Sequence, residues 1–197
     1  AGVAGSGSID AKHGTNITDF ITISSWLKTN DIVTTKVIAS RRNFDSVDRI
    51  NYIFDINTAS KFEFVFTSGQ TGIYHIWAST STISQLGINN NYWHHATISY
   101  TYGTGSSIRL YVDGINIAGS WTNGDGNALP QLNSTLRTTV GSSYYTTYES
   151  YFNGTLDEVS IWNRSLSATE VLNIYNRQKD AFIQQGEYQS EIFDAGS

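Results

Sequence analysis

The sequence predicts an all-β fold: a two-sheet antiparallel β-sandwich (jelly roll) with one short helix near residues 167–176. Two observations predict it. Runs of alternating apolar and polar residues recur along the 197-residue chain, and turn residues separate them. Proline occurs once, at Pro130 between two such runs, so it interrupts no predicted strand. A chain of this length is most simply folded as one large sandwich.

Ten segments have the length and alternation of strands, and they are residues 21–28, 33–40, 49–56, 61–68, 72–79, 94–102, 107–114, 115–121, 137–143 and 155–163. Asp113 and Gly114 stand between two of these segments. This pair predicts a type I′ hairpin turn, because both central residues of that turn have positive φ angles.

Residues 165–178 depart from the β pattern and predict the helix. Ser167 can cap its N-terminus, and Glu170 follows three residues later, as in a capping box. Leu166 and Val171 are spaced to pack against each other across the cap. We therefore expect a helix that starts immediately after Ser167.

The domain organisation follows from where these patterns stop. Residues 1–8 (AGVAGSGS) are small and polar, and we interpret them as a linker or an expression remnant. Residues 9–180 form the predicted sandwich, and residues 181–197 form an extension or a linker to a following domain. No apolar run is long enough to cross a bilayer, and we expect any export signal to lie outside this segment.

Composition excludes several function classes. The absence of cysteine rules out thiol catalysis, thiolate metal sites and iron–sulfur clusters. The formal net charge of −5 at pH 7 argues against nucleic-acid binding, which requires a basic face. The polar residues are mainly Ser, Thr, Asn, Gln and Gly, a composition that suits extracellular β proteins.

Three blocks carry a family resemblance: DFITISSWLK (19–28), NNYWHHATISY (90–100) with SIRLYVDGINIA (107–118), and YFNGTLDEVSIWNRSLSATEVLNIY (151–175). Over residues 10–178 the chain resembles the laminin-G-like family, which includes pentraxin-like and concanavalin A-like domains. The resemblance implies two antiparallel sheets packed face to face. It also implies an extracellular or cell-surface location.

The same resemblance implies a structural calcium ion. Many members hold calcium between the N-terminal strand and the Asp of a Gly-x-x-Asp segment, which here is Asp157 after Gly154. Asp10 and Asp19 are the candidate partners near the chain start. The alternative is that backbone amides or an arginine satisfy the Asp157 carboxylate. The loop 120–130 fails the EF-hand pattern and is predicted to be a polar loop.

The candidate ligand surface consists of aromatic and planar polar side chains, because sugars offer apolar C–H faces and hydroxyl groups. A tyrosine-rich segment at 142–152, a second loop and a polar tip supply them, with the candidate residues Tyr144, Tyr145, Tyr148, Trp121, Arg41, Arg42 and Asn43. The alternative interpretation is that the tyrosines cover strand edges.

No catalytic residue is predicted. Glycoside hydrolases of this shape place paired carboxylates a few residues apart on one strand, and no glutamate here, Glu63 included, has such a partner. Trp26, Trp93 and Trp162 are predicted to pack in the core. His94 and His95 should point to opposite faces of a strand, so they cannot chelate one ion together.

These observations favour an extracellular carbohydrate-binding or adhesive, lectin-like module of a larger cell-surface protein, and not an enzyme. Its expected partner is a glycan or an extracellular protein, with no nucleic acid and no direct membrane insertion. The alternatives are a protein-interaction or spacer domain without a sugar site and, less favoured, a polysaccharide-degrading enzyme. Four N-x-S/T sequons suit a glycoprotein, at Asn16, Asn133, Asn153 and Asn163.

Overall fold

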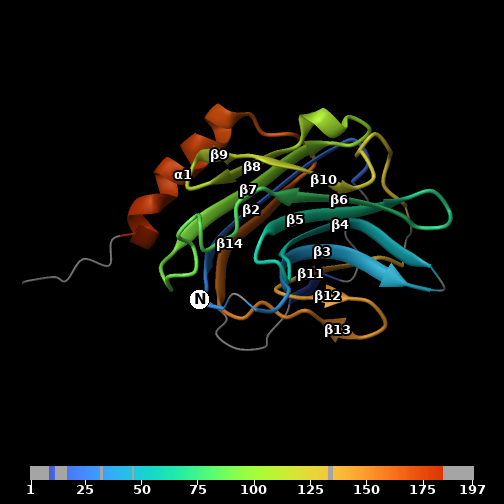
Figure 1. Cartoon of the computed structure of the whole chain (residues 1–197), viewed down its shortest axis with the longest axis horizontal. Coiled ribbons are helices and arrows are strands. Elements are labelled where there is room, and N and C mark those ends of the chain that lie inside the picture. The colour runs from blue at the N-terminus through green and yellow to red at the C-terminus, as the bar shows by residue number, and fades with distance from the viewer. Residues whose placement is uncertain (1–8, 12–16, 32, 46, 133–134, 184–197) are drawn as a thin grey trace, which may run out of the picture.

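The computed structural model describes residues 9–11, 17–31, 33–45, 47–132 and 135–183. Two large antiparallel sheets pack face to face, and one helix lies outside them (Figure 1). This arrangement confirms the predicted β-sandwich. Among the described residues, no helix has the length and hydrophobicity of a membrane-spanning segment.

The first sheet has seven strands in the order β1 (Ile9–Ala11), β11 (Arg137–Val140), β3 (Lys36–Phe44), β4 (Asp48–Ile56), β5 (Phe62–Ser68), β6 (Ile73–Ser79) and β10 (Gly119–Asn123). The second has five, in the order β14 (Thr155–Trp162), β2 (Phe20–Lys28), β7 (His94–Thr101), β8 (Arg109–Val112) and β9 (Ile115–Ile117). A short ribbon pairs β12 (Ser143–Tyr144) with β13 (Tyr148–Glu149). The helices are the 3₁₀ turn η1 (Gly105–Ser107) and α1 (Ala168–Ile183).

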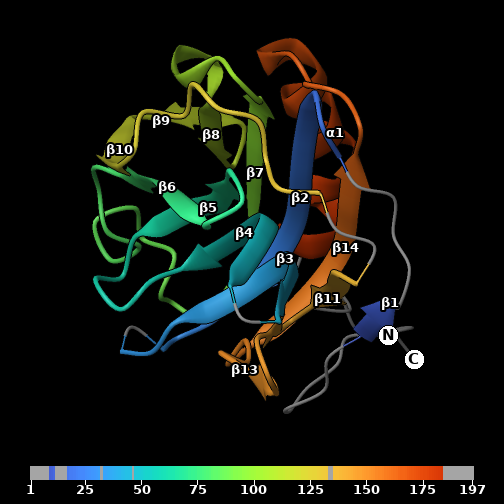
Figure 2. The same ribbon diagram turned by 90° about the vertical axis from the view of Figure 1, so that its right-hand side faces the viewer.

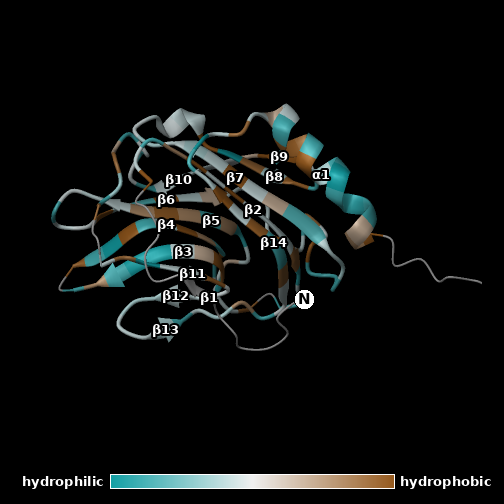
Figure 3. Ribbon diagram, turned by 180° about the vertical axis from the view of Figure 1, so that it is seen from behind, coloured by the Kyte–Doolittle hydropathy of each residue, from teal (hydrophilic) through white to brown (hydrophobic). Residues whose placement is uncertain are grey.

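The core between the sheets consists mainly of isoleucine and phenylalanine side chains that alternate along the strands. Ile21, Ile23 and Leu27 face inward from β2, while Phe62 and Phe64 face inward from β5. Figure 3 shows this apolar colouring along the strands of both sheets. Because strand side chains alternate between faces, the intervening residues of β2 point outward.

The helix α1 covers the outer face of the five-stranded sheet as a third layer (Figure 2). Trp26 on β2 is completely buried there, and its ring stacks on Phe182 with centroids 4.5 Å apart. Trp162 packs beneath the same helix, while Trp93 meets the edge of Phe182 at 5.1 Å. The predicted core packing is therefore confirmed for Trp26, and Trp162 packs against a buried cluster, but this part of the core lies between the sheet and the helix; Trp93 is only half-buried at its edge.

The two local motifs predicted from the sequence are confirmed. Asp113 and Gly114 have φ angles of +50° and +78°, as the type I′ turn between β8 and β9 requires. At the start of α1, the Ser167 hydroxyl and backbone N–H both donate to the Glu170 carboxylate at 2.9 Å. The Glu170 N–H donates back to the Ser167 hydroxyl at 3.3 Å. The hydrogen bonds that the carboxylate accepts from Ser167 and from the Arg164 side chain hold the pKa of Glu170 down at about 2.

Several predicted boundaries are wrong. The helix starts as predicted but continues to Ile183, beyond residue 176, and the rest of 181–197 and all of 1–8 lie outside the described residues. The segment 115–121 is not one strand, because β9 and β10 belong to different sheets. The chain crosses at Gly119, where a Cβ would stand 2.1 Å from the Trp77 indole, so a larger residue cannot fit.

Candidate functional site

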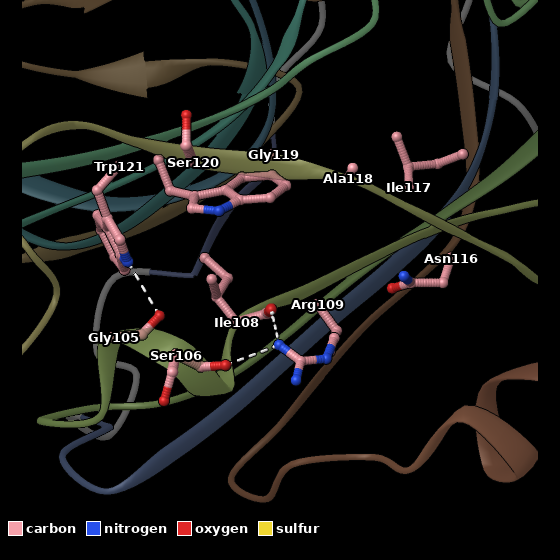
Figure 4. A pocket seen from close by; sticks show the side chains of 11 residues that line it. Gly105, Ser106, Ile108, Arg109, Asn116, Ile117, Ala118, Gly119, Ser120 and Trp121 are labelled. Atoms are coloured by element: carbon pink, nitrogen blue, oxygen red, sulfur yellow. Dashed lines mark hydrogen bonds between the residues drawn. The ribbon is translucent and has the colours of Figure 1, made fainter.

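An open cleft lies at one edge of the sandwich, where β9 ends one sheet and β10 ends the other (Figure 4). Its volume is about 530 Å³, which is within the range of small-molecule sites. Eleven residues line it, namely Trp77, Gly105, Ser106, Ile108, Arg109, Asn116, Ile117, Ala118, Gly119, Ser120 and Trp121. The cleft exists because the chain leaves one sheet at Ile117 and enters the other at Gly119.

Trp121 is held in place at one end of the cleft. Its indole N–H donates to the Gly105 carbonyl at 2.9 Å (Figure 4). A Cβ on Gly126, which has a φ of +72°, would lie 2.1 Å from this indole. The ring also meets Tyr100 and Phe66 edge to face, at 5.7 Å and 6.1 Å. Trp121 therefore lies on β10 and packs partly into the core, which corrects its predicted place at the head of a loop.

His75 contacts the loop whose Gly126 packs against Trp121. Its Nδ1 accepts the Gly126 N–H at 3.2 Å, and its Nε2 lies 2.9 Å from the Ser68 hydroxyl. The first contact requires a neutral ring with its proton on Nε2, because a charged ring has no acceptor. Burial lowers the pKa of His75, and Asp125 partly opposes that shift. At neutral pH the ring therefore holds the loop that carries Gly126 against Trp121.

Polar groups surround the apolar surfaces of the cleft. Arg109 and Asn116 lie on the adjacent strands β8 and β9, and both side chains are exposed. Ser106 and Ser120 are part of the same lining. An indole together with planar amide and guanidinium groups is the combination that sugar recognition requires, since it matches both C–H faces and hydroxyl groups.

The predicted tyrosine-rich loop is a short hairpin that packs beside β3. The Arg42 guanidinium lies 4.5 Å from the Tyr145 ring centre, and the Arg137 guanidinium lies 4.2 Å from that of Tyr144. Tyr148 meets Tyr144 edge to face at 5.2 Å. In each pair the guanidinium occupies one face of the tyrosine ring, a face that a sugar would otherwise use. The interpretation that the tyrosines cover a strand edge describes this arrangement well.

The three residues predicted as a polar tip lie within strand β3, so that placement is corrected. Arg41 is buried and donates to the Thr138 hydroxyl at 3.0 Å, and this burial lowers its pKa. Arg42 binds the two oxygens of Asp48 through Nε and Nη2, at 2.7 Å and 2.6 Å. Asn43 donates to the Thr135 hydroxyl at 3.1 Å. All three side chains make contacts within the protein.

The structure thus divides the predicted ligand residues between two places. Arg42 lies on β3 with the tyrosines beside it, whereas Trp121 lies on β10, four strands away in the same sheet. At about 4.8 Å per strand this separation is roughly 19 Å. Arg109 and Asn116 were missed, because nothing in the sequence shows that the edges of two different sheets meet.

The predicted calcium ligands are also separated. Asp157 pairs with Trp26 on β2, whereas Asp19 immediately precedes β2, seven residues away or roughly 23 Å along the strand. The structure therefore does not bring Asp19 and Asp157 together. β1, which carries Asp10, and β14 are edge strands on the same side of the sandwich (Figure 2). The Asp157 carboxylate accepts the Glu158 N–H at 2.8 Å, and the described residues contain no cluster of three metal-binding side chains.

Calcium binding through Asp157 stays a prediction, and thermal melting tests it. A metal at a hundredfold excess over its Kd stabilises the folded state by about 2.7 kcal/mol, or roughly 5–10 °C for a domain of this size. We expect a chelator to lower the melting temperature and calcium to restore it, with magnesium less effective. Asp157→Asn should remove the response. Identical melting curves with chelator and with calcium would contradict the prediction.

One pair of carboxylates was missed entirely. Asp55 on β4 lies directly opposite Glu63 on β5. Asp55 is 5% exposed and one of its oxygens has no hydrogen-bond partner, while Asn57 donates to Glu63 at 2.8 Å. Burial raises the pKa of both groups, and Glu63 raises that of Asp55 further. Burial of Asp55 favours a structural role for the pair over one in catalysis.

Two antiparallel sheets of seven and five strands, packed face to face, define a jelly-roll β-sandwich. Residues 3–172 match the concanavalin A-like lectin/glucanases superfamily, and the chain belongs to this superfamily. A search of curated protein sequences returned no match.

Solved structures with the same fold include binding domains of bacterial toxins. The binding domain of botulinum neurotoxin DC in complex with rat synaptotagmin II has a TM-score of 0.59 at 14% identity, over 89% of this chain and 41% of that one. The same domain in complex with SialylT gives 0.55 at 14% identity, over 81% and 35%. The chain thus spans well under half of these domains.

A pentraxin shares the fold as well. The heptameric SAP-like pentraxin from Limulus polyphemus has a TM-score of 0.53 at 13% identity, over 80% of this chain and 70% of that chain. At such identities these likenesses establish the fold alone.

Proposed function

We propose that this domain is an extracellular carbohydrate-binding, lectin-like module of a larger cell-surface protein, with its glycan site in the cleft between β9 and β10. The observation that carries the proposal is the lining of this cleft: the fixed indole of Trp121 together with the exposed amide of Asn116 and the guanidinium of Arg109. The domain acts by binding and not by catalysis.

Several features support this proposal. The related toxin domains are binding domains, and one was solved with SialylT. The sequons at Asn153 and Asn163 are exposed, as glycosylation at a cell surface requires, whereas those at Asn16 and Asn133 lie outside the described residues. The tyrosine hairpin remains the second candidate surface. We favour the cleft because an arginine already occupies one face of Tyr144 and one face of Tyr145.

A protein ligand is the second candidate function. One of the toxin domains with this fold was solved with a protein, rat synaptotagmin II. Large apolar side chains are also exposed on this chain, including Tyr92 at 66% and Ile115 at 67%. A protein ligand would engage such side chains, and its binding would be insensitive to added sugars.

Asn116→Ala should weaken glycan binding about 2- to 10-fold, because it removes one neutral hydrogen-bonding group from the cleft. A glycan array would identify a ligand, and isothermal titration calorimetry would measure its affinity. Asn123→Ala is the matched control, since Asn123 is an exposed asparagine of β10 outside the cleft lining. It should bind as the parent protein does.

A second variant distinguishes the two candidate surfaces. Changing Tyr144, Tyr145 and Tyr148 together to alanine should leave the affinity within twofold if the cleft is the site. If this triple variant folds and loses binding while Asn116→Ala retains it, the glycan site is the hairpin. If no glycan binds the parent protein, the proposed function is wrong.

A further inference from the structure

Arg109 is fixed at the cleft through one of its terminal nitrogens. Its Nη1 donates to the Ser106 carbonyl at 2.8 Å and to the Ile108 carbonyl at 2.7 Å (Figure 4). Within the described part of the chain, Nε and Nη2 make no hydrogen bond, and no carboxylate lies within 4 Å of this guanidinium. The side chain is therefore held in one orientation while its other edge stays available.

Arg42 shows what such an edge binds. In Arg42, Nε and Nη2 each donate to one oxygen of Asp48, at 2.7 Å and 2.6 Å, and Nη1 reaches Glu149 at 2.8 Å. Paired N–H groups on this edge match the two oxygens of a carboxylate. Arg109 has the same edge, with backbone carbonyls holding Nη1 in place of a carboxylate.

The electrostatics of the whole chain make this position distinctive. The formal net charge is −5, so the average surface repels anions. Other arginines are neutralised by a carboxylate. Arg42 lies 2.6 Å from Asp48, and Arg164 lies 2.6 Å from Glu170. Arg109 instead presents an unneutralised cation in the same cleft as Asn116 and Trp121.

We infer that the cleft selects glycans that carry a carboxylate, with Arg109 as the residue that determines this specificity. The inference rests on the proposed function. Nε and Nη2 of Arg109 bind the two carboxylate oxygens, while Asn116 and Ser120 contact hydroxyl groups. Trp121 provides the apolar surface for the ring of the sugar. A neutral sugar would lack the charged contact and leave this edge of the guanidinium to water.

The test compares acidic glycans with their neutral counterparts. The probes are tetragalacturonate and tetragalactose, 3′-sialyllactose and lactose, and a sulfated galactose tetramer, within an array that also carries unrelated neutral glycans. We expect at least one carboxylated probe to bind about 10- to 100-fold more tightly than its neutral counterpart, as a charge-assisted hydrogen-bonded pair predicts. Arg109→Gln should reduce that ratio to about twofold or less.

Two further variants make the result specific. Arg109→Lys retains the charge without the paired N–H groups, and it should recover only part of the preference. Arg177→Gln removes one positive charge from the exposed surface of α1, and it should leave the ratio unchanged. Melting curves should show that all variants remain folded.

The possible failures are distinct. If the protein binds only neutral glycans, or if Arg109→Gln keeps the full preference, this inference is wrong while the glycan-binding proposal stands. Tighter binding of the sulfated tetramer than of every carboxylated probe would also overturn it, because the site would then be selective for sulfate. If no glycan binds, the proposed function fails and this inference fails with it.

Discussion

Trp26→Ala should lower the free energy of unfolding by about 3–5 kcal/mol, which is the usual cost of removing a buried tryptophan side chain. Trp26 is completely buried and lies between Phe182, at 4.5 Å, and His95, at 5.3 Å. Its indole N–H also donates to the Gln178 side chain at 2.9 Å. For a domain of this size the melting temperature should fall by roughly 6–20 °C.

Two milder variants separate the packing of Trp26 from its hydrogen bond. Trp26→Phe retains an aromatic ring between sheet and helix but loses the indole donor, so the loss should be clearly smaller. Gln178→Ala removes only the acceptor, and a single hydrogen bond of this kind contributes about 1 kcal/mol. Thermal or denaturant unfolding would measure all three. A loss of less than 1 kcal/mol for Trp26→Ala would mean that α1 does not pack on this sheet.

The fold was predictable because its determinants are local. The Asp113–Gly114 turn and the Ser167–Glu170 cap each depend on residues close together in the sequence, and both are found as predicted. Alternation likewise identified most strands. The alternation did not show that Trp26 would lie beneath the helix. Alternating residues point to opposite faces of a strand, but the alternation does not say which face packs on the other sheet and which on the helix.

The candidate site was less predictable because it depends on how strands are ordered in space. Trp121 and Arg109 lie on strands of different sheets, and only the crossing at Gly119 brings those strands to one cleft. Glu158 has a φ of +48°, and the register between β14 and β2 shifts beside it, so Asp157 and Glu158 do not follow the regular alternation of a strand. Such a bulge cannot be recognised from the alternation of residues.

The Asp55–Glu63 pair shows the same limit, and it leads to the second large effect. A search along single strands could not join these residues, since Asp55 lies on β4 and Glu63 on β5. Directly opposed like charges destabilise a sheet. Arg42 lowers the pKa of Asp55, but burial and Glu63 raise it by more. The two carboxylates therefore favour a state in which they hold a proton.

The raised pKa values of Asp55 and Glu63 determine how the stability of the protein changes with pH. A carboxyl whose pKa is higher in the folded than in the unfolded state binds protons more tightly when folded. Its contribution to stability is fully present below the unfolded values, 3.8 for Asp and 4.5 for Glu, and is lost as the pH rises through the folded values. His95, whose pKa burial lowers to about 4, acts in the opposite direction in the acidic range.

Asp55→Asn should therefore stabilise the protein at pH 7, by on the order of 1–3 kcal/mol, since it removes a buried and incompletely hydrogen-bonded carboxylate. The gain should shrink toward pH 4. Denaturant unfolding of variant and parent protein at each pH cancels the contribution of His95. Asp180→Asn is the control, because Asp180 is an exposed aspartate on α1, outside both sheets. A variant that is less stable at pH 7, or whose gain does not depend on pH, would show that Asp55 is charged and stabilised in the folded protein.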